Sequence, residues 1–337
     1  MASSKITLLG VTSIKNTQKY YFLLAAKKLG LAVKELAKLP RMQDGILRER
    51  VVMQITDGKK FLLTLGATTS QTSYLGMKIA VNKVATNILL KKSGLPTTQQ
   101  IDIHSENDLA IALARFGKII IKPANSRAGK GVFSNIRSFR KAQAIYKNLK
   151  KRYSIIVAEK IIEGNEYRAL VINGRVFAVA QYVPPVVTGD GKHSIRFLID
   201  KENAKRLAAG NNHLITINTA LRLNLKDSQL TTSSVLLKGR RVILHKAAPI
   251  SNGGLTIDAT KKIHPKNKLV AEHAAKLMNL DIAGIDIITP RIEEPMKSAG
   301  GAIIEINGGP DFDVHFSVHK GKSRNGAEAV LRDYFNL

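Results

Sequence analysis

The chain has 337 residues with 44% hydrophobic content, no cysteine, and a formal net charge of +28 from 53 basic and 25 acidic side chains. A chain of this length buries a large interior and is expected to divide into two or three domains. The lack of cysteine excludes disulfide scaffolds, thiolate zinc sites and cysteine nucleophiles, and it fits a reducing compartment such as the cytoplasm. No apolar run approaches the roughly 18 residues that span a bilayer, so we expect no membrane segment.

The first 34 residues contain several lysines and no acid, which is also the composition of an organelle transit peptide. Residues 5–11, KITLLGV, favour an opening strand. Residues 19–33, KYYFLLAAKKLGLAV, favour a helix with Tyr21, Leu24 and Leu29 on one apolar face. We predict a small α/β unit here and keep the transit peptide as the alternative.

Residues 116–133, FGKIIIKPANSRAGKGVF, predict an apolar strand that ends at Lys122 and is followed by a loop with Gly129, Lys130 and Gly131. Glycines let backbone N–H groups approach phosphate oxygens, and lysines add positive charge. The loop is neither a P-loop nor a Rossmann fingerprint, because Gly-Lys-Ser/Thr and the spacing G-x-G-x-x-G are both missing. By itself it is a weak indication of phosphate binding.

Residues 154–182 predict a strand running into Glu159, followed by a hairpin that turns at Asn173-Gly174. In one interpretation the backbone of Lys160 and Ile161 pairs with an adenine edge while Glu166 accepts the ribose hydroxyls. The alternative is that Glu166 is a solvated acid in a loop.

Two β-branched runs near the end of the chain carry Asp286 on one predicted strand and Glu305 and Asn307 on the next. Because strand side chains alternate, Glu305 and Asn307 share a face. Oxygen ligands of this kind suit Mg²⁺, which prefers a few carboxylates together with phosphate oxygens and water. Exposed acids on a hairpin remain the alternative for this segment alone.

His315 and His319 lie four residues apart, a spacing that one helical face could present to zinc. No third nitrogen or sulfur ligand is near in sequence, so we do not predict a zinc site.

Taken in order, these segments resemble the ATP-grasp ligases, and in particular the ATP-grasp domain of cyanophycin synthetase and of bifunctional glutathione synthetase. The resemblance also rests on GMKIAVNKVATNILLKKSGLP, GDGKHSIRFLI, SNGGLTIDATKKIHPKN, AIIEINGGPDFDVHF and HKGKSRNGAEAVLRDYF. It covers the chain from about residue 60 to the end. It implies an α/β (α+β) ATP-grasp fold with two subdomains that grip ATP after a small α/β N-terminal lobe. The expected domains are residues 1–75 for the lobe, 76–157 for the first subdomain, and 158–337 for the second, with the magnesium site.

The resemblance implies ATP and Mg²⁺ as cofactors, with Mn²⁺ as a substitute. Asp286, Glu305 and Asn307 would hold the metal. Glu159 to Ile161 would hold adenine and Glu166 the ribose. The phosphates would be held by Lys83, by Lys122 and by the covering loop of residues 125–131, including Ser126, Gly129, Lys130 and Gly131.

The acceptor side departs from the cyanophycin-type pattern. Ser251 and Asn252 stand in Pro-Ile-Ser-Asn-Gly-Gly where Asn-Leu-Ser-Thr-Gly-Gly is usual, and Asp311 replaces a glycine. These departures leave the amino-acid substrate open. Gly284 stands where D-alanine ligases have an arginine, which argues against that activity.

The implied reaction is carboxylate–amine ligation through an acyl phosphate, on amino acids or short peptides, with release of ADP. The protein then supplies positioning and charge and needs no nucleophile of its own. The backbone N–H groups of Gly308 and Gly309 are candidates for stabilising an oxyanion, and the cationic candidates are Lys246, Arg168 and Arg196. His315 is expected in the substrate pocket. Arg324 either clamps a substrate carboxylate or lies on the surface.

The charge of +28 is not explained by the resemblance. A nucleic-acid partner is not favoured, because the lysines occur as scattered pairs and aromatic residues make up only 5%. An acidic substrate and a generally basic composition remain as explanations. A homo-oligomer is left open. A second hypothesis is a basic binding protein that keeps the fold and binds nucleotide without turnover.

Overall fold

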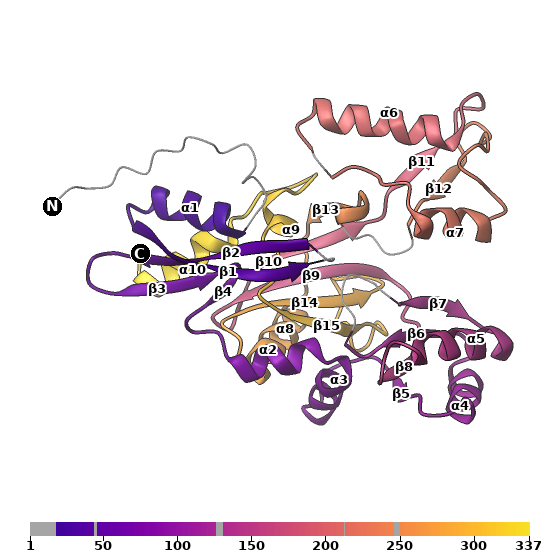
Figure 1. Ribbon diagram of the computed structural model, residues 1–337, viewed down its shortest axis with the longest axis horizontal. Coiled ribbons are helices and arrows are strands. Elements are labelled where there is room, and N and C mark those ends of the chain that lie inside the picture. The colour runs from indigo at the N-terminus through magenta and orange to yellow at the C-terminus, as the bar shows by residue number, and fades with distance from the viewer. Residues whose placement is uncertain (1–17, 44–45, 126–130, 212, 246–249) are drawn as a thin grey trace.

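The computed structural model describes residues 18–43, 46–125, 131–211, 213–245 and 250–337. In these residues the strands form four sheets, and the neighbouring strands of each sheet run antiparallel (Figure 1). No helix in this part of the chain is long and apolar enough to cross a membrane.

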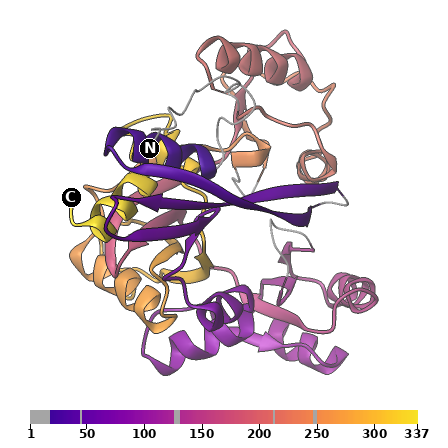
Figure 2. The same ribbon diagram turned by 60° about the vertical axis from the view of Figure 1, so that its left-hand side comes forward.

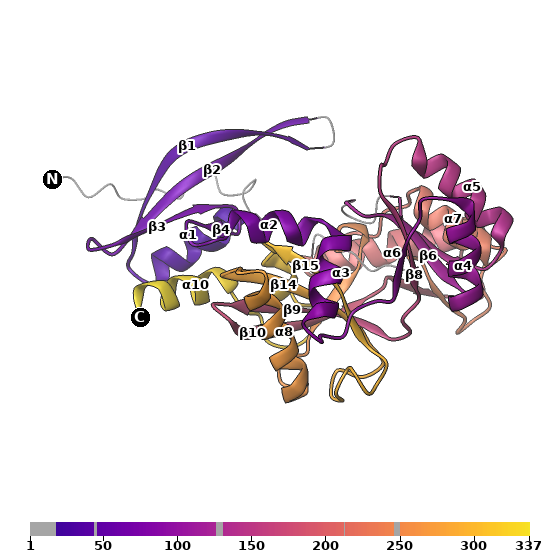
Figure 3. The same cartoon turned by 90° about the horizontal axis from the view of Figure 1, so that it is seen from below.

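The N-terminal unit combines one helix with a sheet whose strands follow the sequence order. Helix α1 (Gln18–Lys28) packs against the C-terminal helix α10 (Gly326–Phe335) and against β1. Figure 3 shows β1 and β2 as a long ribbon that extends beyond β3. The strands are β1 (Ala32–Gln43), β2 (Ile46–Thr56), β3 (Phe61–Leu65) and β4 (Thr68–Thr69).

The helix predicted over residues 19–33 is shorter than expected. It ends at Lys28, because Gly30 adopts φ +69° and the chain enters β1 at Ala32. The predicted apolar face is wrong at Leu24, which is 38% exposed, since the buried stripe consists of Tyr21, Phe22, Ala25 and Ala26. The opening strand predicted over residues 5–11 lies outside the described residues.

A small sheet with two covering helices carries the predicted strand IIIK. Its own core includes Leu109, Ile121, Tyr146 and Ala158. The helices are α4 (Glu106–Phe116) and α5 (Phe139–Lys150), and the strand order is β5 (Gln100–Asp102), β8 (Ile156–Lys160), β6 (Ile119–Pro123) and β7 (Phe133–Ile136).

The central sheet contains the predicted hairpin and the two predicted metal-binding strands. Asn173 and Gly174 both have positive φ, as a tight hairpin turn requires, so the predicted turn is confirmed. The strand order is β13 (Leu255–Asp258), β10 (Arg175–Val183), β9 (Asn165–Ile172), β14 (Ile282–Thr289) and β15 (Ala302–Gly308).

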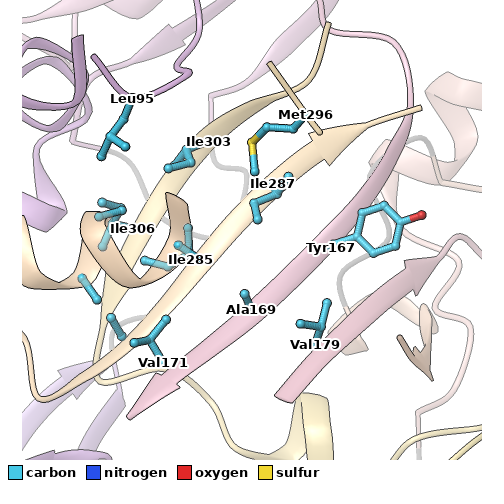
Figure 4. Packing of buried hydrophobic residues seen from close by; sticks show 14 of the residues in the cluster. Leu95, Tyr167, Ala169, Val171, Val179, Ile285, Ile287, Met296, Ile303 and Ile306 are labelled. Carbon is cyan, nitrogen blue, oxygen red and sulfur yellow. The ribbon is translucent and has the colours of Figure 1, made fainter. Parts of the chain in front are cut away.

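The two faces of the central sheet differ. One face is largely apolar and packs against helices α2 (Tyr74–Val81), α3 (Lys83–Lys92) and α8 (Pro265–Leu277); Figure 4 shows Ile285, Ile287 and Val171 in this core. The other face is apolar only at one end, where Leu170 and Ile282 pack under α1 and α10. The rest of that face carries polar side chains.

A separate lobe is inserted between β10 and β13. It has its own core, which includes Val187, Ile199, Leu221 and Leu244. Figure 2 shows this lobe and the small sheet on opposite sides of the molecule. The lobe contains β11 (Val186–Thr188), α6 (Ile195–Ala208), α7 (Thr219–Asp227) and β12 (Arg241–Ile243), and the turn η2 (Ile250–Asn252) and helix α9 (Asp313–Phe316) lie beyond it in the chain. The domain boundaries at residues 75 and 157 stay predictions.

Candidate active site

A row of charged side chains crosses the polar face of the central sheet. Asp286 lies opposite Glu305 on β15 and opposite Arg168 on β9, and the row continues through Ala180 on β10 to Asp258 on β13. Directly opposed residues on antiparallel strands point to the same face. The predicted neighbouring strands for Asp286 and Glu305 are therefore confirmed, and strand pairing brings Arg168 between two acids.

Arg168 and Asp286 form a buried ion pair with two hydrogen bonds. The Nε and Nη2 atoms of Arg168 donate to the two carboxylate oxygens at 2.6 Å each. The amide nitrogen of Asn307 donates to the same carboxylate at 2.9 Å. Burial is the largest single effect on Arg168 and lowers its pKa, but the charge of Asp286, its hydrogen bond to Arg168, and the charges of Tyr182 and Glu305 together outweigh burial and hold the pKa well above its ordinary value. Gly284 permits the close approach of Pro310, because a Cβ there would lie 2.8 Å from Pro310 Cβ, whereas its 3.4 Å distance to Arg168 Cδ would be an ordinary contact.

Glu166 belongs to the same group of carboxylates. Burial, and next the negative charge of Asp286, raise the pKa of Glu166 to about 7; Glu305 adds to this and Arg168 opposes it. The Nζ of Lys83 lies 3.4 Å from Glu305. Three carboxylates, Glu166, Asp286 and Glu305, lie near the amide of Asn307, and oxygen ligands of this kind suit a divalent cation. Among the described residues no three acidic or histidine side chains are grouped closely enough to hold a metal ion by themselves, so the metal role of Asp286, Glu305 and Asn307 stays a prediction.

Lys122 and Glu159 form a second buried pair, on the small sheet. Lys122 Nζ lies 2.7 Å from a carboxylate oxygen of Glu159, and their side chains are 9% and 4% exposed. The backbone N–H of Lys160 already donates to the carbonyl of Gln99, and Ile161 follows the end of β8. A pocket between this sheet and β15 is lined by Lys83, Glu159 and Glu305 among others.

The glycines predicted to act on the substrate have packing roles. A Cβ on Gly308 would lie 2.2 Å from Met77 Sδ, and one on Gly309, which has φ +78°, would lie 2.9 Å from Thr68 Cγ2. Gly131 also has positive φ and approaches Pro123. The predicted loop residues Ser126, Gly129 and Lys130 and the predicted catalytic Lys246 lie outside the described residues.

The predicted acceptor residues lie around β13 and the turn before it. His315 is buried, and burial, followed by the positive charge of Arg168, lowers its pKa to about 3. Arg324 is not a surface arginine; it is 17% exposed and pairs with Asp258 at 3.3 Å. Ser251 and Asn252 form turn η2, and Asn252 accepts a hydrogen bond from Asn218 of the inserted lobe at 3.3 Å.

Arg196 is placed apart from the other candidates. It lies exposed in the first turn of α6, within the inserted lobe. The charged row on the central sheet instead includes Arg168 as its central cation.

Asp313 is a buried acid whose contacts with three separate segments could not be predicted from the sequence. It accepts a hydrogen bond from Tyr21 Oη of α1 at 2.5 Å, another from Ser317, and lies 3.1 Å from His213 Nε2 of the inserted lobe. Burial alone would raise the pKa of Asp313, and these bonds lower it below its ordinary value. The only sequence signal is an acid in the apolar context DFDVHF, so three distant segments meet at a residue with no motif of its own.

Comparisons with known proteins agree with the predicted resemblance. No family model matches the chain. It is 34% identical over 306 residues to a cyanophycin synthetase from Geminocystis herdmanii, covering 88% of this chain and 35% of that protein. It is 30% identical over 293 residues to the glutathione biosynthesis bifunctional protein of Clostridium perfringens, covering 84% of this chain and 38% of that protein.

A solved structure shares the fold. The crystal structure of a bifunctional glutathione synthetase from Pasteurella multocida superposes with a TM-score of 0.61 at 26% identity, covering 89% of this chain and 42% of that one. The chain spans about a third of the length of the curated relatives it matches. The predicted resemblance to the ATP-grasp ligases and the predicted fold class are confirmed.

Proposed function

We propose, from the premise that this chain has the ATP-grasp fold, that it is an ATP-dependent carboxylate–amine ligase acting on amino acids or short peptides. The observation that carries the proposal is the pairing of three candidate cations, two predicted to bind phosphate and one predicted to be catalytic, with acids predicted to bind metal or nucleotide. The first pair, Arg168–Asp286, lies on the central sheet. The second, Lys83–Glu305, joins α3 to β15, and the third, Lys122–Glu159, lies on the small sheet.

The proposed residue roles follow from these positions. Asp286, Glu305 and Asn307 hold Mg²⁺, for which Mn²⁺ could substitute, and the ion neutralises phosphate charge when bound. Lys83 and Lys122 hold the phosphates of ATP. Since the N–H of Lys160 is already bonded, its carbonyl and the backbone of Ile161 are the groups proposed to pair with adenine.

The proposed place of Glu166 differs from the ribose role that the resemblance implies. Its carboxylate lies with Asp286 and Glu305, which raise its pKa. We therefore propose that Glu166 contributes to the charge balance around the metal ion.

The proposed chemistry has two steps. A carboxylate oxygen of the first substrate attacks the γ-phosphorus of ATP, the bond to the β-phosphate oxygen breaks, and ADP leaves. An amine of the second substrate then attacks the acyl carbon, phosphate leaves with the bonding electron pair, and the amine loses a proton. Arg168 lies between Asp286 and the acceptor side of the sheet, so we propose that it stabilises the phosphate that leaves.

The test is ADP release from magnesium-ATP against a matrix of amino acids and short peptides, with products identified by mass. A ligase gives ADP release that depends on both a carboxylate and an amine substrate, and a product whose mass is that of the two substrates less one water. Glu305→Gln should abolish both signals. Glu163→Gln, which changes a carboxylate that is 80% exposed, is the matched control and should leave both unchanged.

One observation favours the alternative of a binding protein without turnover. Both carboxylate oxygens of Asp286 already accept bonds from Arg168, and one also accepts from Asn307. A carboxylate offers about four acceptor positions, so one remains for a metal. If ATP binds with magnesium but no combination of substrates releases ADP, the alternative holds. From the lack of cysteine we propose that the protein acts in the cytoplasm.

A further inference from the structure

One stretch of the chain is unusually rich in positive charge. Residues 118–158 contain eleven lysines and arginines and no aspartate or glutamate. Two of the cations are used within the fold, since Lys122 pairs with buried Glu159 and Lys118 pairs with Glu163. Most of the others are exposed on α5 and its flanks.

Helix α5 presents these charges as a line. Its buried side is formed by Ala142, Ile145, Tyr146 and Leu149, which pack on the small sheet. The opposite side carries what we call the basic ridge, Arg140, Lys147 and Lys151, at spacings of seven and four residues and flanked by Lys141 and Lys150. At 1.5 Å per residue the ridge is about 16 Å long. Exposed Ala144 lies on the ridge between Arg140 and Lys147, so a partner could approach closely there.

The stability of α5 does not explain the ridge. Cations in the last turn of a helix complement its dipole, but Arg140 and Lys141 lie in the first turn, where acids are favoured and this helix has none. Repulsion between neighbouring cations is unfavourable as well. No described acid contacts Arg140, Lys141 or Lys151. Arg140, Lys141 and Lys151 therefore present positive charge that no described acid compensates, while Lys147 on the same ridge is paired with Glu106.

An ion pair within the protein indicates which kind of molecule would bind the basic ridge. Lys147 pairs with the carboxylate of Glu106 on α4 at 3.2 Å, with both side chains partly exposed. The ridge residues Arg140, Ala144, Lys147 and Lys151 include no aromatic side chain; Phe139 beside the ridge is 41% exposed and Tyr146 lies on the buried side of the helix, so there is no row of exposed rings for stacking on the bases of single-stranded nucleic acid. We propose that the basic ridge of α5 is a docking surface for an acidic polypeptide segment. This proposal goes beyond the ligase activity and does not depend on it.

The test compares two variants that lose the same charge. Arg140→Gln, Lys141→Gln and Lys151→Gln together remove three charges from the ridge region while keeping good helix formers. Lys261→Gln, Lys262→Gln and Lys268→Gln remove three exposed charges from the α8 region. Binding of fluorescent polyglutamate is measured by anisotropy at low salt. We expect the ridge variant to bind about tenfold more weakly and the α8 variant to bind within about twofold of the unmodified protein.

A second measurement does not need the charge variants to fold normally. Because the chain has no cysteine, a fluorophore can be attached only where a cysteine is introduced. A label at Ala144→Cys on the ridge should respond to polyglutamate, and one at Leu269→Cys, which is 64% exposed on α8, should not. Equal loss of affinity in both charge variants, equal response of both labels, or no binding at all would overturn the proposal. If an RNA duplex binds more tightly than polyglutamate, and the ridge variant loses this binding, the assignment to an acidic polypeptide is overturned.

Discussion

Replacing Lys122 tests the fold and the proposed phosphate site together. Lys122→Met removes an ammonium group that lies 2.7 Å from Glu159, where the two side chains are 9% and 4% exposed. The carboxylate of Glu159 would then be buried without its charged partner. Breaking a buried pair in this way costs about 3–5 kcal/mol of folding free energy. If Lys122 also holds phosphates, the variant should lose on the order of 2–4 kcal/mol of transition-state stabilisation in the ligation reaction.

A double-mutant cycle separates these two effects. Glu159→Gln removes the charge of Glu159, so the variant Lys122→Met/Glu159→Gln should recover most of the folding free energy that Lys122→Met alone loses. Its affinity for magnesium-ATP should stay low, since the ammonium is still missing. Glu159→Gln alone keeps the ammonium of Lys122 and removes the carboxylate that competes with phosphate for it, so this variant should bind magnesium-ATP at least as tightly as the unmodified protein.

The measurements are urea unfolding at neutral pH and calorimetric titration with magnesium-ATP. Lys118→Met is the matched control, because Lys118 lies just before the same strand and pairs with Glu163, which is 80% exposed. It should cost less than about 1 kcal/mol. If Lys122→Met costs no more than this control, the buried pair does not stabilise the fold. If the double variant binds ATP as well as the unmodified protein, Lys122 does not hold phosphate.

Three further outcomes are expected. Glu305→Gln should abolish ligation with an unchanged melting temperature, and turnover within about threefold of normal would contradict the metal role. Because the pKa of His315 is about 3 in the fold and about 6.5 when unfolded, the unfolded chain binds the extra proton between these values. Stability relative to His315→Leu should therefore fall by about 2 kcal/mol from pH 7 to pH 5, and parallel curves would contradict this. Tyr21→Phe removes a hydrogen bond to buried Asp313 and should lower the free energy of unfolding in urea by about 1–3 kcal/mol. An unchanged free energy of unfolding would show that this hydrogen bond does not stabilise the fold.

Strand positions were predictable because they depend on local pattern. The runs around Asp286 and Glu305 are short and rich in β-branched isoleucine, and Asn173-Gly174 is a strong hairpin signal. These features need no knowledge of distant residues, and the corresponding elements β14, β15 and the β9–β10 hairpin are present.

Partners across the sheets were not predictable from the same patterns. Arg168 and Asp286 are 118 residues apart, and they meet because β9 pairs with β14 in one particular register. A shift of one residue would turn Arg168 to the other face. Asp313 meets Tyr21 across 292 residues, through the packing of α1 onto the C-terminal segment. Hydrophobic periodicity contains no information on either pairing, so the strand that carries a residue could be predicted while its partner across the fold could not.

The charge pairs have a consequence for how nucleotide and metal would bind. Lys83, Lys122 and Arg168 each have a carboxylate partner, so phosphates must compete with Glu305, Glu159 and Asp286 for these cations. ATP alone would draw Lys83 away from Glu305 and leave that acid near the phosphates, where like charges repel. A divalent cation alone would compete with Lys83 for Glu305. If both bind as proposed, Glu305 would contact the metal and Lys83 the phosphates, so each member of this pair would keep a partner of opposite sign. Metal and nucleotide should therefore bind cooperatively, and the coupling should depend on the same pairs that hold the site together.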